Sequence, residues 1–359
     1  MKRVHNFSAG PAALPAEVLK KVQTELLDYK GKGRSIMEMS HRSPEYSEIH
    51  EQAGEKLKKL LNAGEGWNVL FLTGGASTQF MMIPMNVLNK ERTADYINTG
   101  SWSTKAIKEA KYFGNVHVPY SSEDLNFTRV PTDNDLNLSD HATYLHFTSN
   151  NTIFGTQFPK EPASNGAPLV CDASSDFLSR PVDLDRYGVI YAGAQKNLGP
   201  AGVTIVMIHD RFLENVLPDP KPTILKYQTH LEKMFNTPPV FAVYTVNYVL
   251  DWISEKGGVN AFAEINEEKA SLLYNEIDRD EFYRGTAEKA SRSRMNVTFR
   301  LSSEELEAEF LKEAADEDLV TLKGHRSVGG IRASIYNACD MESVQTLVSF
   351  MNDFRDRKG

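Results

Sequence analysis

The chain has only two cysteines among its 359 residues, Cys171 and Cys339. Neither lies in a CxxC pair or at a metal-ligand spacing, so we expect neither a disulfide framework nor a bound metal ion. No apolar run approaches the roughly 20 residues that a membrane helix needs. The first residues, MKRVHNFSAG, also lack the apolar core of a secretory signal. These absences predict a cytoplasmic protein with no membrane segment.

The chain also has no excess of basic residues. The 40 Lys and Arg residues are outnumbered by 48 Asp and Glu residues, which gives a formal net charge of −8. This balance argues against a broad nucleic-acid surface, although a local anion pocket is compatible with it. The length is sufficient for about two domains with a large buried core.

Short apolar segments typical of strands alternate with helical patterns through the first part of the chain. This order predicts an α/β fold with a mostly parallel sheet. Ligands of such sheets bind beyond the carboxyl ends of the strands, so residues that directly follow a strand are the functional candidates. The predicted strands are 69–73, 94–98, 143–148, 169–171, 188–192 and 203–208, and the predicted helices include 79–88 and 104–113.

The pattern changes after about residue 258. A long amphipathic helix, a strand at 295–301, a helix opened by Ser303, a strand at 328–334 and a closing helix predict a smaller α+β domain. The proline-rich stretch 217–239 is predicted to be a long loop. We therefore divide the chain into an N-terminal segment contributing to the active site (1–15), a large cofactor-binding domain (16–258) and a small C-terminal domain (259–359).

Two charged residues follow predicted strands. Lys196 lies in the turn GAQKNLGPAG (193–202), and Asp172 ends the strand 169–171. Each has an ordinary interpretation, as a surface lysine and as a turn former. Lysine can also form a Schiff base with a carbonyl cofactor, and aspartate can pair with a pyridinium nitrogen. Together the two residues suit the opposite ends of one flat ring.

Three further features fit the same cofactor. The turn 74–78 (GGAST) joins a strand to a helix, as a phosphate cup does, although a capped helix without ligand is an equal interpretation. Trp102 is placed to stack on a ring, or it is a core residue. Thr152 follows another strand and can form a hydrogen bond with a ring substituent. Each signal is weak alone, but together these features at strand ends favour pyridoxal phosphate.

Motifs along the whole chain resemble those of the phosphoserine aminotransferases, which are class V members of the fold type I pyridoxal-phosphate enzymes. They are NFSAGPAALP (6–15), SIMEMSHRSPEY (35–46), GGASTQF (74–80), DASSDFLSRPVD (172–183), YGVIYAGAQKNLGPAG (187–202), FNTPP (235–239), SRSRMNV (291–297) and GHRSVGGIRASIYNA (324–338). The resemblance implies a large domain with a mostly parallel seven-stranded sheet flanked by helices, and a homodimer with shared active sites. It also implies interconversion of 3-phosphohydroxypyruvate plus L-glutamate and O-phospho-L-serine plus 2-oxoglutarate, in serine biosynthesis.

The resemblance also assigns roles to matching positions. Lys196 carries the cofactor and shuttles a proton, and Asp172 holds the pyridine nitrogen. Asn236 and Thr237 reach the cofactor phosphate of the neighbouring subunit. The implied cofactor-binding set is Ala76, Ser77, Trp102, Thr152, Asp172, Gln195, Lys196, Asn236 and Thr237, and the implied substrate-binding set is Ala9, His41, Arg42, His325, Arg326 and Arg332.

The chain departs from the family at one place, because some members have Gly-Arg where it has Ala76-Ser77. Anion binding must then rest more on two similar tetrads, SHRS (40–43) and GHRS (324–327). These are either solvated loop charge or a phosphate clamp, in which arginine supplies a planar fork and histidine a further donor. Arg332 suits an α-carboxylate.

Several alternatives stay open at the level of the sequence. A cysteine desulfurase needs a mobile, exposed cysteine, whereas Cys171 lies in a predicted buried strand and Cys339 precedes the last helix. Another class V aminotransferase, acting on a small amino acid, would have no use for the paired tetrads. A non-catalytic cofactor-binding regulator is not excluded by Lys196 and Asp172. Activity on the phosphorylated hydroxythreonine of pyridoxine biosynthesis cannot be derived from the sequence.

Overall fold

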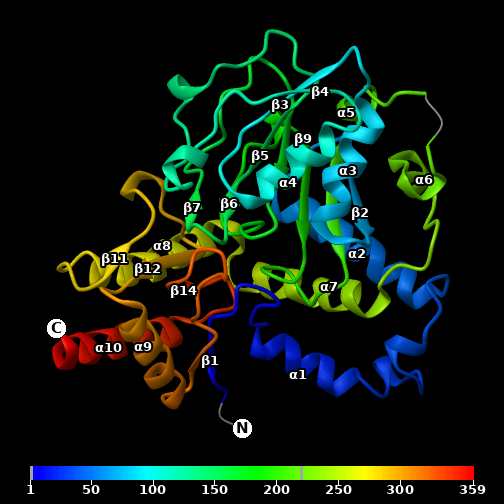
Figure 1. The fold of residues 1–359 in the computed structure, drawn as a ribbon. Coiled ribbons are helices and arrows are strands. Elements are labelled where there is room, and N and C mark those ends of the chain that lie inside the picture. Colours follow the sequence, from blue (N-terminus) through cyan, green and yellow to red (C-terminus); the bar gives the residue numbers. More distant parts are fainter. Residues whose placement is uncertain (1–2, 219–220) are drawn as a thin grey trace.

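A computed structural model of the chain describes residues 3–218 and 221–359 and has two lobes (Figure 1). The larger lobe contains a seven-stranded sheet, and the smaller lobe, at the lower left of Figure 1, contains a three-stranded sheet. The predicted α/β class and mostly parallel sheet are confirmed. Residues 1–2 of the proposed N-terminal segment and residues 219–220 of the predicted loop lie outside the described residues. The domain boundaries remain a prediction.

The large sheet has the strand order β2-β10-β9-β8-β5-β3-β4. Only β10 is antiparallel to its neighbours, β2 and β9; the other pairs are parallel. All strands but β10 therefore end at the same edge of the sheet, which is where parallel sheets bind ligands. The strands are β2 (Trp67–Leu72), β3 (Thr93–Tyr96), β4 (Asn115–His117), β5 (Leu145–Thr148), β8 (Leu169–Asp172), β9 (Tyr187–Gly193) and β10 (Thr204–His209).

Helices cover both faces of this sheet, and each face has its own hydrophobic core. One core joins the sheet to α1, α2 and α7, and the other joins it to α3 and α4. The central strands β5, β8 and β9 are buried on both faces, as parallel strands between helix layers are, whereas the edge strand β4 is partly exposed. The helices of this lobe are α1 (Ala16–Glu25), α2 (Pro44–Leu60), α3 (Gly75–Val87), α4 (Ser101–Ala110), α5 (Asp210–Leu213), α6 (Tyr227–Glu232) and α7 (Val240–Glu255).

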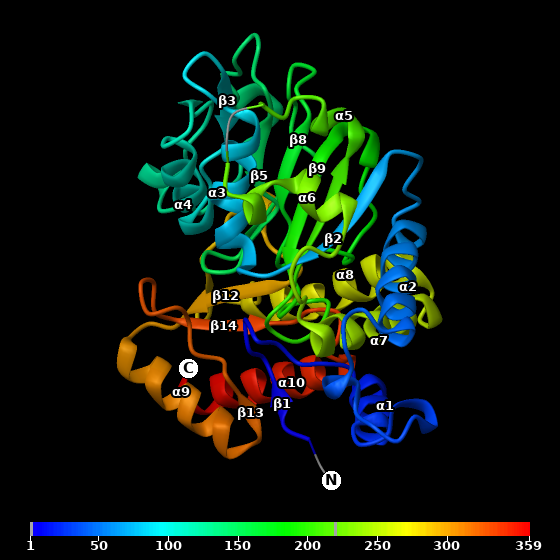
Figure 2. The same ribbon diagram turned by 90° about the vertical axis from the view of Figure 1, so that its right-hand side faces the viewer.

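The smaller lobe packs helices against the sheet β11-β12-β14 around a third core (Figure 2). The N-terminal strand β1 pairs with β13 in this lobe, so the chain begins beside its own C-terminal part. Ser303 caps α9 through a hydrogen bond from Leu306 N–H to its Oγ (3.2 Å), as predicted. The elements are β1 (His5–Asn6), β11 (Arg284–Gly285), β12 (Asn296–Arg300), β13 (Leu319–Val320), β14 (Ile331–Ser334), α8 (Gly258–Ile277), α9 (Glu304–Asp316) and α10 (Met341–Lys358), and a hairpin of β6 (Asn150–Asn151) and β7 (Thr156–Gln157) belongs to the large lobe.

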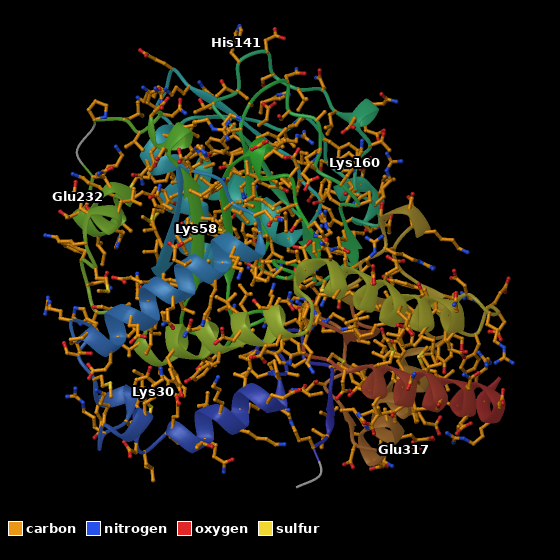
Figure 3. The ribbon with its side chains drawn as sticks, turned by 180° about the vertical axis from the view of Figure 1, so that it is seen from behind. Lys30, Lys58, His141, Lys160, Glu232 and Glu317 are labelled. Carbon is orange, nitrogen blue, oxygen red and sulfur yellow. The ribbon has the colours of Figure 1, made fainter. Side chains whose placement is uncertain are left out.

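The long helix α8 connects the lobes. Its first residues, such as Phe262, pack in a core of the large lobe, and later ones, such as Leu273, pack in the core of the small lobe. Figure 3 shows the molecule from behind, with Lys160, Glu232 and Glu317 projecting from different parts of its surface. None of the described helices combines the length and the apolar character required to cross a membrane.

Two parts of the sequence prediction need correction. The stretch 217–239 is not a continuous loop, because α6 and a short 3-10 turn (Thr223–Leu225) lie within it. Helix α7 was not predicted at all. Ten of its residues are buried, so it has no polar face that would reveal helical periodicity.

Candidate active site

Lys196 lies in the turn from β9 to β10, at the edge where the parallel strands end. A backbone hydrogen bond from Gly199 N–H to Ala194 O (2.8 Å) closes the turn. A Cβ on Gly199 would lie 2.8 Å from Val246 Cγ2, so glycine allows the turn to pack directly on α7. The Lys196 side chain is half-buried, and its Nζ lies 5.6 Å from the centroid of the Trp102 ring.

Asp172 is the last residue of β8 and is buried. Its Oδ1 accepts a hydrogen bond from Ser174 N–H (3.0 Å). Burial raises the pKa of Asp172, and the charge of Lys196 opposes that rise. Burial likewise lowers the pKa of Lys196, and Asp172 opposes that fall. Each side chain thus favours the charged form of the other, while burial in a poorly hydrated site disfavours both charged forms.

Trp102, in the first turn of α4, joins this pair to the small lobe. Its Nε1 donates a hydrogen bond to Thr152 Oγ1 (3.2 Å), and the backbone carbonyl of Thr152 accepts one from Arg332 Nη1 (3.1 Å). The charge of Arg332 also contributes to the lowered pKa of Lys196. The structure therefore brings together Lys196, Asp172, Trp102, Thr152 and Arg332, which come from five separate segments.

The Gly-rich turn after β2 provides the start of α3. Gly74 (φ +93°) and Gly75 (φ +67°) adopt left-handed conformations that favour glycine. The first turn of α3 contains no acidic residue, so the positive end of the helix is available to an anion. Ala76 packs in the same hydrophobic cluster as Trp102, and Ser77 is exposed.

The N-terminal segment crosses this site. The backbone N–H of Ala12 donates a hydrogen bond to the carbonyl oxygen of Gln195 (2.8 Å). Gly10 faces the lysine, since a Cβ there would lie 3.3 Å from Lys196 Cγ. The carbonyl oxygen of Ala9 accepts a hydrogen bond from Tyr336 Oη (2.8 Å). Gln195 and Ala9 are thus both placed beside Lys196.

One of the two His-Arg pairs belongs to a cluster of cations. Burial lowers the pKa of His325, and so do the positive charges of Arg332, Arg326 and Lys105. Lys105 Nζ also lies 4.4 Å from the centroid of the Trp102 ring, so the cluster adjoins the Lys196 site. Lys105 was missed from the sequence, and the predicted helix 104–113 did not include Trp102. In the structure both residues belong to α4, three positions apart and on one face of the helix. Such a cluster fits an anionic ligand.

The other His-Arg pair is not brought to this place within one chain. The segment before α2 that contains His41 and Arg42 and the loop before β14 lie on opposite sides of the molecule in Figures 1 and 2. The Nε2 atom of His41 is buried without a hydrogen-bond partner among the described residues. Asn236 and Thr237, which precede α7, form no hydrogen bond with the residues around Lys196 in the described part of the chain, and Asn236 lines a separate cavity with His50.

A second buried carboxylate near Lys196 was also missed. Asp176 accepts hydrogen bonds from Ser149 Oγ and from Gln157 Nε2 (3.0 Å for the latter). Its charge opposes the fall in the pKa of Lys196. The signal was its position four residues after Asp172, within a motif that was otherwise interpreted only through Asp172.

The chain matches the family model described as aminotransferase class-V over residues 4–347. It therefore belongs to the class V aminotransferases. Relatives that share about half of its residues are phosphoserine aminotransferases: the protein of that name from Niallia circulans is 53% identical over 363 aligned positions, which cover 100% of this chain and 99% of the relative.

Solved structures give the same result. Phosphoserine aminotransferase from Bacillus circulans subsp. alkalophilus has a TM-score of 0.97 at 52% identity, with 100% of both chains covered. The pyridoxal-phosphate-bound phosphoserine aminotransferase from Trichomonas vaginalis has a TM-score of 0.92 at 40% identity, with 98% of this chain and 100% of that chain covered. The family that the sequence motifs indicated is confirmed.

As a class V aminotransferase, the enzyme uses pyridoxal 5′-phosphate, and the residues present fit this group. The buried carboxylate of Asp172 suits the ring nitrogen, the amine of Lys196 suits the aldehyde carbon, and Trp102 offers a flat surface. The start of α3 at Gly75 suits the phosphate. All four groups lie at the edge of the sheet where the parallel strands end, which is the arrangement that a single small cofactor requires.

Proposed function

We propose that this protein interconverts 3-phosphohydroxypyruvate plus L-glutamate and O-phospho-L-serine plus 2-oxoglutarate, as a pyridoxal-phosphate-dependent transaminase of L-serine biosynthesis. The observation that carries this proposal is the position of the Lys196–Asp172 pair beside the cations Arg332, His325 and Arg326. The pair suits transamination, and the cluster suits a substrate with an anion at each end. The names of the relatives support the same substrate.

The chain's own groups have separate tasks in this reaction. Pyridoxal phosphate, when bound, supplies an electron-withdrawing ring that stabilises negative charge at the substrate α-carbon. Asp172, a buried carboxylate, would pair with the protonated ring nitrogen and favour its protonated form. Lys196, whose pKa is lowered by burial, would hold the cofactor and would accept the proton of the substrate α-carbon as a base. Trp102, whose ring lies below Lys196 Nζ, would cover the cofactor ring and exclude water.

The cations divide the substrate between them. Arg332, whose guanidinium is held by the Thr152 carbonyl, pairs with the α-carboxylate in a fork geometry. His325 and Arg326 bind the distal phosphate of phosphoserine or the distal carboxylate of glutamate. One set of cations thereby serves both half-reactions.

We also propose that the active enzyme is a cytoplasmic homodimer with shared sites. His41, Arg42, Asn236 and Thr237 would complete the site of the second copy. Their positions away from the Lys196 site in their own chain support this arrangement. The two cysteines are buried and unpaired, which suits a reducing compartment.

The test is a single-turnover absorbance measurement on the purified holoenzyme. Phosphoserine should convert the cofactor to its amino form, and 3-phosphohydroxypyruvate should reverse the change. Alanine should react slowly. Equal rates with phosphoserine and alanine would favour another class V aminotransferase, and bound cofactor without any conversion would favour a non-catalytic regulator. Phosphorylated hydroxythreonine, as a further amino donor, tests for a role in pyridoxine biosynthesis.

A further inference from the structure

A second buried lysine lies outside the site described above. Lys269, on α8, is fully buried and forms no ion pair with any described residue. Its Nζ instead donates hydrogen bonds to three backbone carbonyls, those of Ile335 (2.9 Å), Tyr336 (2.8 Å) and Cys339 (3.0 Å). All three belong to the short segment between β14 and α10, residues 335–339.

The ammonium form of Lys269 is the form that this geometry requires. Burial lowers its pKa to about 8, while the neighbouring Cys339 and Asp340 oppose the fall. The group is therefore mostly protonated at neutral pH and has three N–H donors for its three acceptors. An apolar side chain would fill the space without burying a charge, but it would leave three carbonyl oxygens without a donor.

The same segment reaches the site around Lys196 at two points. The backbone N–H of Asn337 donates to Oδ1 of Asn197 (2.9 Å), the residue that follows Lys196. The hydroxyl of Tyr336 donates to the carbonyl of Ala9 (2.8 Å), next to the glycine that faces the lysine stem. Residues 335–339 thus contact the Lys196 turn and the N-terminal segment that crosses it.

Helix α8 holds this segment at a second position. Asn266, nearly one turn before Lys269, donates from Nδ2 to Oδ1 of Asn337 (2.8 Å) and to the carbonyl of Ser179 (3.2 Å). The Nδ2 atom of Asn337 donates to the carbonyl of Leu178 (3.0 Å). These contacts are buried, so water does not readily replace them.

We propose that Lys269 is a positioning residue for transamination: its ammonium fixes residues 335–339, and these fix Asn197 and Ala9 beside Lys196. The proposal rests on the proposed function of Lys196. Loss of the ammonium frees three carbonyls and lets the segment shift. A small displacement of a reacting group is sufficient to slow a reaction by up to about 10²-fold.

The test compares Lys269→Met with Leu273→Ala, measured on the holoenzyme. Leu273 lies one turn further along α8 and is fully buried in the core of the small lobe, so its truncation destabilises the same helix but leaves the three hydrogen bonds from Lys269 Nζ to the segment in place. Both variants should have a lower Tm. Only Lys269→Met should slow the glutamate half-reaction, by roughly 10- to 100-fold in kcat with little change in KM, and alter the visible circular dichroism of the bound cofactor.

Two further measurements keep the proposal falsifiable. Lys269→Gln retains two N–H donors and should keep more of the rate than Lys269→Met; it also replaces the latter if that variant does not fold. In a double-mutant cycle with Asn197→Ala, the rate of the double variant should lie within about threefold of the rate of the slower single variant, because both changes break the same connection. Amide hydrogen exchange of residues 335–340 in the cofactor-free protein should be faster in Lys269→Met than in Leu273→Ala.

Wild-type kcat and circular dichroism in Lys269→Met, an equal loss in Leu273→Ala, or multiplying effects with Asn197→Ala would each overturn the positioning role. A failure of the proposed function has a different signature. In that case the unaltered holoenzyme does not convert glutamate, while the exchange of residues 335–340 still reports whether Lys269 holds the segment.

Discussion

Lys196 and Lys269 are both lysines whose pKa is lowered by burial, yet their surroundings differ. All three donors of Lys269 are taken by backbone carbonyls. Lys196 Nζ forms no hydrogen bond within the described part of the chain and lies over the Trp102 ring, near the carboxylate of Asp172. Burial alone therefore does not make a lysine reactive. An amine becomes a nucleophile and a base when its neighbours lower its pKa and leave it free to move.

The largest difference between the two lysines should appear on deletion. Lys196→Ala removes the covalent and acid–base group, so turnover of phosphoserine should fall by on the order of 10³-fold or more. Turnover should fall far less in Lys269→Met, because Lys269 acts only by positioning other residues. Steady-state rates of both variants, with cofactor content measured in parallel, make the comparison. Equal losses would mean that Lys196 is no more than another positioning residue.

The stability of the protein should respond to Lys269 at alkaline pH. The unfolded lysine keeps its proton up to its ordinary pKa of 10.5, whereas the folded one loses it at about 8. Between these values the unfolded state binds more protons, so the free energy of unfolding should rise with pH, by up to about 3 kcal/mol. Cys339 stays protonated throughout, because burial raises its pKa to about 12.

Denaturant unfolding of wild type and Lys269→Met at pH 7 and pH 10 checks this expectation. The variant serves as the control, since it lacks the group but shares all other titrations. A difference between the two proteins that stays constant with pH would show that Lys269 does not titrate in this window.

The cations around Lys196 have no counterpart at Lys269, and they should determine the substrate. Each charge-assisted hydrogen bond contributes about 1.5–3 kcal/mol, so Arg326→Ala should weaken phosphoserine use by roughly 10- to 100-fold. Arg42→Ala should do the same if the second subunit supplies that residue. Alanine, without a distal anion, should be nearly indifferent to both. Arg332→Ala should lower the rates with both phosphoserine and alanine, because both substrates have an α-carboxylate.

Single-turnover rates for these three variants, with phosphoserine, glutamate and alanine, give the answer. If Arg326→Ala and Arg42→Ala slow the reactions of phosphoserine and alanine equally, the cluster does not bind the substrate phosphate.

The smallest expected effect tests which residues come from the second subunit. Lys196→Ala chains mixed with chains carrying both Asn236→Ala and Thr237→Ala should regain part of the wild-type activity, because one site of each hybrid dimer would then be intact. Separately purified parents provide the baselines. Verified hybrids without any recovery would place Asn236 and Thr237 in the site of their own subunit, or outside any site.

The two lysines also show what sequence patterns can predict. Lys196 was identified because it lies in a turn between two buried strands, and Asp172 because it ends a neighbouring strand; the parallel topology brings strand ends together. Lys269 was not identified. Its partners are backbone carbonyls about 70 residues away, and no side-chain pattern records them. Helix α7 was missed because it is buried on nearly every side.

Borohydride reduction of the holoenzyme, followed by peptide mapping, tests the central claim most directly. Reduction fixes the cofactor to the amine that holds it. We predict that the label is found on Lys196 alone and that Lys269 remains unmodified. Label on Lys269, or on any other lysine, would contradict the assignment of Lys196 as the reactive group.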